Sequence, residues 1–149
     1  MKNIDQYIPG INKGIRIYYD RGLQKYKIGW AQQFLLEYIY TNPGIHSQTL
    51  TDTFYAEKST ISKGLKRLYE EGYIRIESDT SDHRSKKIYA TEKADEVIKH
   101  IRHLQTRLHQ SLEKNFSEQE LSYLKCSLER LQDNLRAVLL TSEEDPQDE

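Results

Sequence analysis

The sequence predicts a mainly α fold with a small β wing. Over most of the chain, apolar residues recur three and four positions apart, which is the spacing of amphipathic helices. Residues 73–77 and 86–89 instead alternate between apolar and polar side chains and are joined by a polar loop, so they predict a β-hairpin. The turn signal Asn42-Pro43-Gly44 and the later Gly72 mark the ends of helical patterns.

The first half of the chain contains four helical patterns. Pro9 interrupts the first, so this helix either begins there, with the proline in its first turn, or is kinked. Residues 22–29 are expected to form a break, and the Asn42-Pro43-Gly44 turn ends the second helix. The expected helices span residues 4–18, 30–40, 46–54 and 58–71.

Two longer helices are expected after the hairpin. Thr91 is expected to cap the first of them, which continues to about Leu112. Ser117 and Glu120 have the spacing of a capping box, in which each side chain bonds the backbone N–H of the other residue. The apolar positions of the last helix alternate three and four residues apart, as in a heptad repeat. They are Leu121, Leu124, Leu128, Leu131, Leu135 and Val138.

The chain is expected to form a single unit, residues 1–149, with a central lobe at residues 30–90. The lobe has enough apolar residues for a small core of its own. The flanking helices, residues 1–29 and 91–142, carry apolar stripes that need a partner. A two-fold homodimer would bury more of these stripes than one chain alone, so we expect the flanks to form a dimerisation region. Residues 143–149 are acidic and are expected to be a flexible tail.

The composition favours a protein that stays in the cytoplasm. Charged residues make up 30% of the sequence and the formal net charge is −1, with cations concentrated around residues 58–87. One cysteine excludes an internal disulfide. The chain has no apolar run near the roughly 20 residues that span a bilayer, and its start lacks the pattern of a secretory signal.

A helix followed by a hairpin, both rich in hydroxyls and cations, is typical of a winged helix-turn-helix that binds DNA. The helix enters the major groove and the hairpin tip reaches the neighbouring minor groove. Arg84 is the strongest candidate because a planar guanidinium fits a narrow minor groove, and Asp82 would orient it through an ion pair. The alternative is that Ser59 and Thr60 only cap the helix and that the tip is an ordinary polar turn. The expected DNA-binding residues are Ser59, Thr60, Ser62, Lys63, Lys66, Arg67, Arg84, Lys86 and Lys87.

The order of these residues resembles the multiple-antibiotic-resistance regulator (MarR) family. Asp82, Arg84 and Thr91 match its wing motif Asp-x-Arg and the Thr-capped helix that follows, and residues 59–62 match the start of its recognition helix. The resemblance implies a homodimeric transcriptional regulator that binds a pseudo-palindromic operator, as a repressor released by a ligand or protein signal. Gly64 departs from the family pattern and is expected to weaken the recognition helix by about 1 kcal/mol relative to alanine.

The same resemblance implies a crevice for a small aromatic or phenolic effector between the DNA-binding lobe and the dimerisation helices. Aromatic residues are concentrated in the segments that would meet there, and tyrosine hydroxyls suit an amphipathic ligand. The alternative is that these side chains are core or dimer interface, which is the usual role of aromatics at helical spacing. The candidate pocket residues are Tyr18, Tyr19, Trp30, Phe34 and Tyr38.

A second candidate function keeps the winged helix but uses it as an adaptor for protein contacts, because the central positive charge is modest and Gly64 interrupts the recognition helix. An enzyme is not expected, since the sequence has no phosphate-binding glycine loop and no His partnered with Cys126. Cys126 is interpreted as a buried structural thiol. His100 and His103 share a helix face without a further ligand at a recognised spacing, so no metal or cofactor is expected.

Overall fold

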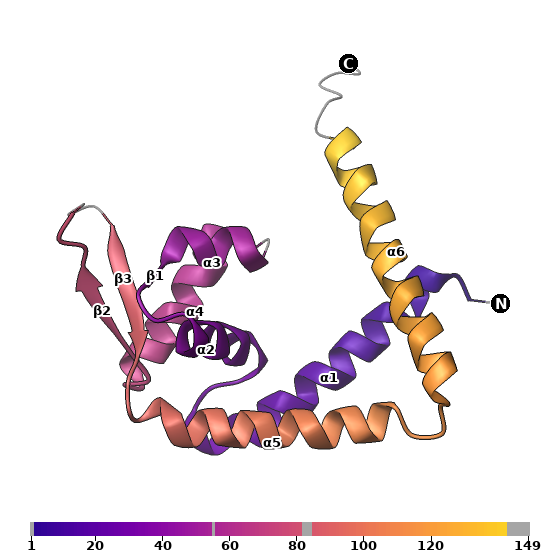
Figure 1. Ribbon diagram of the computed structural model, residues 1–149, viewed down its shortest axis with the longest axis horizontal. Coiled ribbons are helices and arrows are strands. Elements are labelled where there is room, and N and C mark those ends of the chain that lie inside the picture. The colour runs from indigo at the N-terminus through magenta and orange to yellow at the C-terminus, as the bar shows by residue number, and fades with distance from the viewer. Residues whose placement is uncertain (1, 55, 82–84, 143–149) are drawn as a thin grey trace. The chain divides into compact units, whose positions relative to one another are not determined.

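The structure, a computed structural model, describes residues 2–54, 56–81 and 85–142. The chain divides into two compact units, Met1–Thr106 and Arg107–Glu149. The elements are labelled in Figure 1. No helix among the described residues is both long and apolar enough to cross a membrane. The elements are η1 (Ile4–Gln6), α1 (Ile8–Leu23), η2 (Gln24–Tyr26), α2 (Trp30–Thr41), β1 (Ile45–His46), α3 (Ser47–Phe54), α4 (Lys58–Glu70), β2 (Ile74–Ser78), β3 (Lys86–Ala90), α5 (Ala94–Leu112) and α6 (Glu118–Ser142).

The mainly helical prediction with a small β wing is confirmed, with shifts at some boundaries. Pro9 lies in the first turn of α1, which begins at Ile8, and a separate 3-10 turn precedes it. The expected break at residues 22–29 is shorter, because α1 continues to Leu23 and a second 3-10 turn follows directly. Lys27 ends that turn in the left-handed region, with φ 58°.

The wing is part of a three-stranded antiparallel sheet with the order β1-β3-β2. The predicted hairpin is confirmed, and its register pairs Ile76 with Ile88. The prediction that His46 begins a helix is wrong, because His46 belongs to β1 and pairs with Lys87 of β3. The short strand therefore joins the segment before α3 to the hairpin, and α3 begins one residue later at Ser47.

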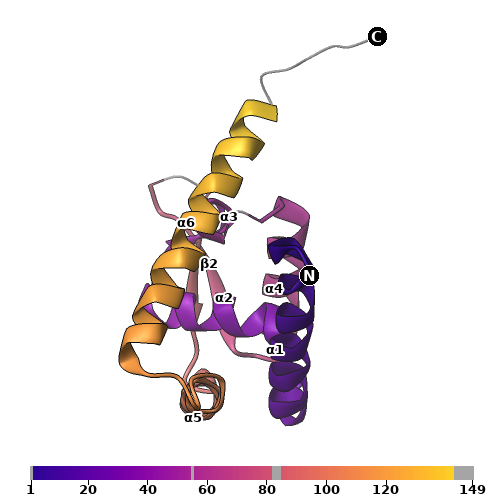
Figure 2. The same ribbon diagram turned by 90° about the vertical axis from the view of Figure 1, so that its right-hand side faces the viewer.

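The core of the first unit lies between α2, α4, the inner face of the sheet and the adjoining faces of α1 and α5. Helix α1 crosses α5. In Figure 2, α5 is viewed along its axis. Two hydrogen-bond-length contacts fix this crossing: the Tyr18 hydroxyl donates to the Leu104 carbonyl at 3.0 Å, and His100 Nε2 lies 2.9 Å from the Gly22 carbonyl. The fully buried apolar residues include Leu23, Leu36, Ile39, Leu50, Leu68, Ile88, Val97, Ile98 and Ile101.

At Gly64 the backbone of the recognition helix, α4, lies close to the Leu35 side chain of α2. Gly64 lies on the buried face of α4, and a methyl group added to it would overlap Cδ1 of Leu35. Leu35 is only 4% exposed, so its side chain has little room to move away. The expected cost in helix propensity is therefore accompanied by a packing role: the absence of a side chain at Gly64 allows the two helices to pack at this distance.

Helix α4 ends in a Schellman motif that leads the chain into the wing. Gly72 has φ +78°, its N–H bonds the Tyr69 carbonyl at 2.9 Å, and the Tyr73 N–H bonds the Leu68 carbonyl at 2.9 Å. The prediction that Thr91 caps α5 with its side chain is wrong. The Thr91 hydroxyl donates instead to the Gly72 carbonyl at 2.6 Å, so it ties the end of the wing to this turn, and α5 begins at Ala94.

The second unit contains the last turns of α5 and the whole of α6. The predicted capping box is confirmed, since the Ser117 N–H donates to Glu120 Oε2 at 2.7 Å and the Glu120 N–H donates to Ser117 Oγ at 3.2 Å. These hydrogen bonds from the Ser117 backbone and hydroxyl lower the pKa of the Glu120 carboxyl. Lys125 pairs with Glu113 at 3.2 Å across the turn between the two helices.

Gly64→Ala is expected to lower the free energy of unfolding by about 1–2 kcal/mol, because an overpacking cost of up to about 3 kcal/mol against Leu35 outweighs the gain of about 1 kcal/mol in helix propensity. Urea unfolding followed by circular dichroism measures this. Gly14→Ala is the matched control, since Gly14 lies on the exposed face of α1 with no atom within 4 Å of an added methyl. Equal stability of Gly64→Ala and wild type would contradict the packing argument.

Candidate nucleic-acid interface

Helix α4 presents one polar face to solvent and buries the other. Its buried residues are Ile61, Gly64, Leu65 and Leu68. The N-cap is Glu57 and no side chain caps the helix, so Ser59 and Thr60 are not its caps. Their hydroxyls, with the side chains one turn further on, belong to the outward face. The exposed residues predicted to bind DNA are Ser59, Thr60, Ser62, Lys63, Lys66 and Arg67.

The cations of α4 differ in how firmly they are held. Lys66 pairs with Glu70 at 3.9 Å, and both side chains are largely exposed. Arg67 makes two contacts at the C-terminal end of the helix: its Nε donates to the Lys27 carbonyl at 2.8 Å, and its guanidinium lies 3.5 Å from Glu71. Arg67 therefore ties α4 to the segment before α2, whereas the cations nearer the N-terminus face solvent.

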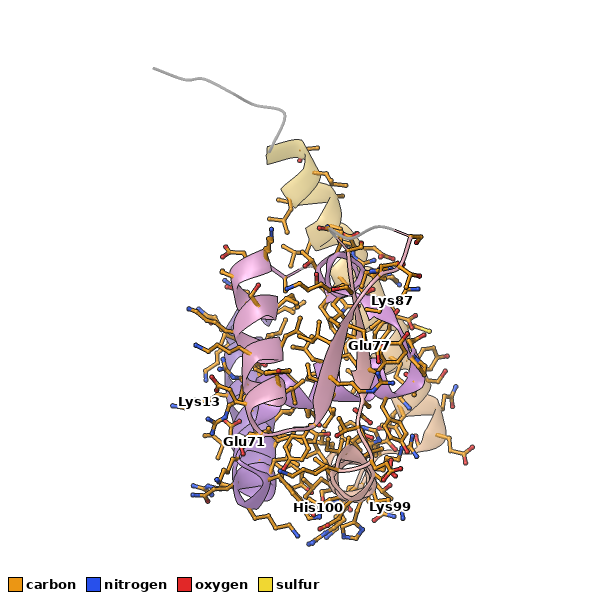
Figure 3. All side chains as sticks on the ribbon, turned by 90° about the vertical axis from the view of Figure 1, so that its left-hand side faces the viewer. Lys13, Glu71, Glu77, Lys87, Lys99 and His100 are labelled. Atoms are coloured by element: carbon orange, nitrogen blue, oxygen red, sulfur yellow. The ribbon has the colours of Figure 1, made fainter. Side chains whose placement is uncertain are left out.

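The wing extends from β2 and β3 beside α4, and Figure 3 shows Glu77 and Lys87 on it. Arg84, predicted to enter the minor groove, and Asp82, predicted to orient it, lie outside the described residues, and their roles remain predictions. Lys86 is exposed. Lys87 is half-buried and its ammonium lies 3.5 Å from Asp79, so part of its charge is used within the wing.

A groove of about 290 Å³ between α4 and the wing brings several predicted residues together. The groove is lined by Ser62 and Lys66 of α4 and by Lys86 of β3. Tyr69 and Ile76 form the apolar part of its lining. Ser47, the first residue of α3, also lines this groove and was missed by sequence reasoning. The missing information was the pairing of β1 with β3, which brings the start of α3 next to the wing.

Asp79 is a second residue that sequence reasoning missed. It directly follows β2, is 6% exposed, and accepts hydrogen bonds from the Ser81 N–H at 3.0 Å and the Ser81 hydroxyl at 2.8 Å. Its carboxylate also lies 3.5 Å from Lys87 Nζ and 3.6 Å from His46 Nε2. The Ser81 hydrogen bonds, and then the Lys87 ammonium, hold the pKa of the Asp79 carboxyl below its ordinary value. An acidic residue immediately after an alternating strand was the available sequence signal.

The aromatic residues predicted to line an effector pocket are only partly brought together. Tyr18, Tyr19, Trp30 and Phe34 form a continuous series, with ring-centroid distances of 5.5, 5.6 and 4.4 Å between successive members. Tyr38 lies apart and packs on Phe54 of α3 at 5.5 Å. Burial raises the pKa of the Tyr19 phenol.

A hollow of about 630 Å³ lies close to this aromatic series but uses none of the five predicted residues. It is lined by Asp20, Gln24, Lys27, Ile28, Gly29, Gln32 and Arg67.

Cys126 belongs to α6 and His100 to α5. The interpretation of Cys126 as buried is wrong, since its side chain is exposed on α6. His100 packs on Tyr26 at 5.2 Å in addition to its contact with the Gly22 carbonyl. Within residues 2–54, 56–81 and 85–142, no group of three or more His, Cys, Asp or Glu side chains is arranged to hold a metal ion.

The arrangement of α3, a short connection, the amphipathic α4 and an antiparallel wing defines a winged helix-turn-helix protein. The sequence model of the MarR family matches residues 28–86, which include this whole arrangement up to the first residue of β3. This match and the relatives below support a MarR-family winged-helix regulator. The family is one of regulators and not of enzymes.

The similarity extends over most of the chain. The HTH-type transcriptional regulator BilQ of Clostridioides difficile (strain CD3) is 25% identical over 137 residues, which cover 92% of this chain and 93% of BilQ. The crystal structure of the transcriptional regulator SlyA is 27% identical, with a TM-score of 0.84 and 90% and 94% of the two chains covered. A MarR-family regulator from Listeria monocytogenes, solved in complex with 26mer DNA, is 21% identical and shares the fold, with a TM-score of 0.84 over 100% and 99% of the chains.

Proposed function

We propose that this protein binds a pseudo-palindromic double-stranded DNA operator as a homodimer in the cytoplasm, and that it acts as a repressor released by a small aromatic or phenolic effector. The observation that carries the DNA-binding proposal is the outward face of α4. Its hydroxyls and cations are exposed as a continuous strip beside the wing, while its opposite face packs in the core. An α-helix with such a face fits the major groove, and a hairpin beside it fits the adjacent minor groove.

The contacts expected at DNA divide by chemistry. Ser59, Thr60 and Ser62 at the N-terminal turns of α4 are suited to base edges or phosphates, and Lys63 to either. Ser47, Lys66 and Lys86 lie around the groove between α4 and the wing, where a phosphate would meet two ammonium groups and a hydroxyl. The Listeria monocytogenes regulator of the same fold was crystallised with DNA, which supports this use of the fold.

Exposed apolar residues on both units support the homodimer. In the first unit, Ile8 and Ile11 of α1 are 48% and 57% exposed. In the second, Leu124, Leu128 and Leu135 of α6 are 44–59% exposed and follow the heptad spacing. Apolar surface of this kind is costly to leave in water, and a second copy of the chain is the partner that the two-fold operator requires.

The aromatic series of Tyr18, Tyr19, Trp30 and Phe34 supports the effector. Phe34 is 36% exposed, so a planar ligand has access to one end of the series. Gln33, next to Phe34 in sequence, is fully buried, and its side-chain amide interacts with the Tyr19 hydroxyl, which lowers the pKa of that phenol against the larger effect of burial.

The alternative function, a winged-helix adaptor without DNA binding, loses part of its basis. One of its two supports was the glycine within the recognition helix, and packing against Leu35 accounts for that residue. The modest positive charge remains, and it predicts a DNA complex that is sensitive to salt.

Operator affinity is expected to fall steeply between 50 and 200 mM salt, and Lys63→Ala is expected to reduce the slope of log K against log salt by about 1. Fluorescence anisotropy on fragments selected from genomic DNA measures both. Arg84→Ala is expected to cost about 1–3 kcal/mol of affinity. Lys99→Ala on α5 (Figure 3) removes the same charge away from α4 and should leave the slope unchanged. A wild-type protein that ignores DNA even in dilute buffer would favour the adaptor.

Sedimentation equilibrium is expected to find a dimer at micromolar concentration. Leu128→Glu places a charge on the heptad stripe and is expected to raise the dissociation constant by at least about 30-fold, the equivalent of losing an interface hot spot of about 2 kcal/mol. Gln132→Glu adds the same charge to an exposed position outside the stripe and should remain dimeric. A wild-type monomer at these concentrations would refute the homodimer.

Phenolic compounds are expected to quench the fluorescence of Trp30, which is the only tryptophan in the chain. The physical reason is that the ring of the phenolic ligand can stack on the edge-to-face pair of Trp30 and Phe34. Phe34→Leu should weaken the response while leaving the folded spectrum intact. No response across several chemical classes, including carboxylated and neutral phenols, would remove the effector from the proposal.

A further inference from the structure

The loop end of the β2–β3 hairpin holds a buried carboxylate whose partners come from two strands and one loop. Asp79 is reached by Ser81 from the loop after β2, by Lys87 from β3 and by His46 from β1. Its own N–H donates to the Ser85 carbonyl at 2.9 Å, so the two ends of the loop are tied together at this residue. We call these residues, Asp79 with His46, Ser81, Ser85 and Lys87, the wing clasp.

His46 has an orientation that makes the wing clasp sensitive to proton binding. Its Nδ1 lies 3.2 Å from the Lys86 carbonyl, which only accepts hydrogen bonds, so Nδ1 is the nitrogen that carries the hydrogen in the neutral ring. The other nitrogen, Nε2, faces the Asp79 carboxylate at 3.6 Å. Proton binding at Nε2 therefore replaces a lone pair with a positive charge directed at Asp79. The charged groups that face the ring are Asp79 and, across the strand pair, Lys87.

We propose that Asp79 is a positioning residue for the DNA-contacting wing: through the wing clasp it holds the end of β2 and the start of β3 relative to β1 and α3, and protonated His46 strengthens this hold. The proposal rests on the proposed DNA-binding function. Asp79 itself is buried and does not contact DNA. Its effect is transmitted through the loop that it closes and through β1, which continues directly into α3.

The sign of the charge separates positioning from simple electrostatics. Removing a negative charge near a phosphate backbone should strengthen DNA binding, because fewer like charges repel each other. If Asp79 positions the wing, its replacement should weaken binding despite the lost repulsion. Asp79→Asn keeps an oxygen that accepts the Ser81 hydrogen bonds and removes only the charge that Lys87 and His46 face.

The experiment compares Asp79→Asn with Glu77→Gln, measured by anisotropy on an operator fragment selected from genomic DNA. Glu77 lies on the same hairpin (Figure 3), is 52% exposed and pairs with Arg75, so its substitution removes the same charge outside the wing clasp. We expect Asp79→Asn to weaken binding by roughly fivefold, which corresponds to one hydrogen bond or ion pair. Glu77→Gln should bind equally well or more tightly. Equal or tighter binding by Asp79→Asn would overturn the proposal.

A pH profile supplies a readout that an inert structural role would not change. Wild-type affinity should rise as the pH falls, because a proton on His46 Nε2 directs a positive charge at Asp79. His46→Gln keeps a hydrogen-bond donor but cannot be protonated, and it should remove most of the rise. A profile identical in wild type and His46→Gln would overturn the contribution of His46, and this variant keeps the proposal testable if Asp79→Asn does not fold.

Two readouts without DNA separate failure of the wing clasp from failure of the proposed function. The Ser81 amide should exchange its hydrogen faster in Asp79→Asn than in wild type, because the neutral amide oxygen that it keeps is a weaker acceptor than a carboxylate. The lowered pKa of Asp79 means that its stabilisation is present above the ordinary value of 3.8 and is lost as the pH falls through the folded-state pKa, so the stability difference between the proteins should shrink in acid. Wild type that binds no DNA refutes the proposed function. Wild type that binds DNA, with Asp79→Asn unchanged in affinity and exchange, refutes the wing clasp.

Discussion

The close approach of α4 to α2 is the constraint on which the rest of the lobe depends. Gly64 removes the side chain that would hold the helices apart, and Leu35 fills the space against its backbone. Because the buried face of α4 is fixed in this way, the rotation of the helix about its axis is fixed as well. The hydroxyls and cations of the opposite face therefore point outward as a set, and a change in the packing distance would redirect all of them together.

The polar residues around α4 and the wing divide into those that hold the structure and those left for a partner. Arg67 bonds the Lys27 carbonyl and Glu71, and Lys87 faces Asp79, so part of the positive charge is neutralised within the lobe. Lys63 and Lys86 stay on the surface. This division explains how a chain with net charge −1 can still present a cationic surface beside a helix. The affinity for DNA then depends on the positions of a few cations. These positions in turn depend on how α4 packs against α2.

Much of the fold was predictable because helical periodicity and turn residues are local signals. The wing, the capping box at Ser117 and the amphipathic face of α4 follow from short stretches of sequence. The errors came from long-range contacts. His46 has a helical neighbourhood in sequence, but β3 recruits it into a strand, and the Thr91 hydroxyl bonds Gly72, a residue far away along the chain. The packing role of Gly64 and the burial of Asp79 likewise depend on contact partners that no local sequence pattern reveals.

The order of the strands has a consequence for unwanted aggregation. β2 is an edge of the sheet, and an edge strand offers unpaired backbone groups to any other extended chain. Its outward side chains Arg75 and Glu77 form an ion pair, and Arg75 also lies over the Tyr89 ring at 4.4 Å, so charge covers the edge. The opposite edge, β1, is only two residues long. Edge-to-edge pairing between sheets of different molecules is thereby disfavoured at both edges of the sheet. The helices then offer the surfaces for contacts between copies of this chain.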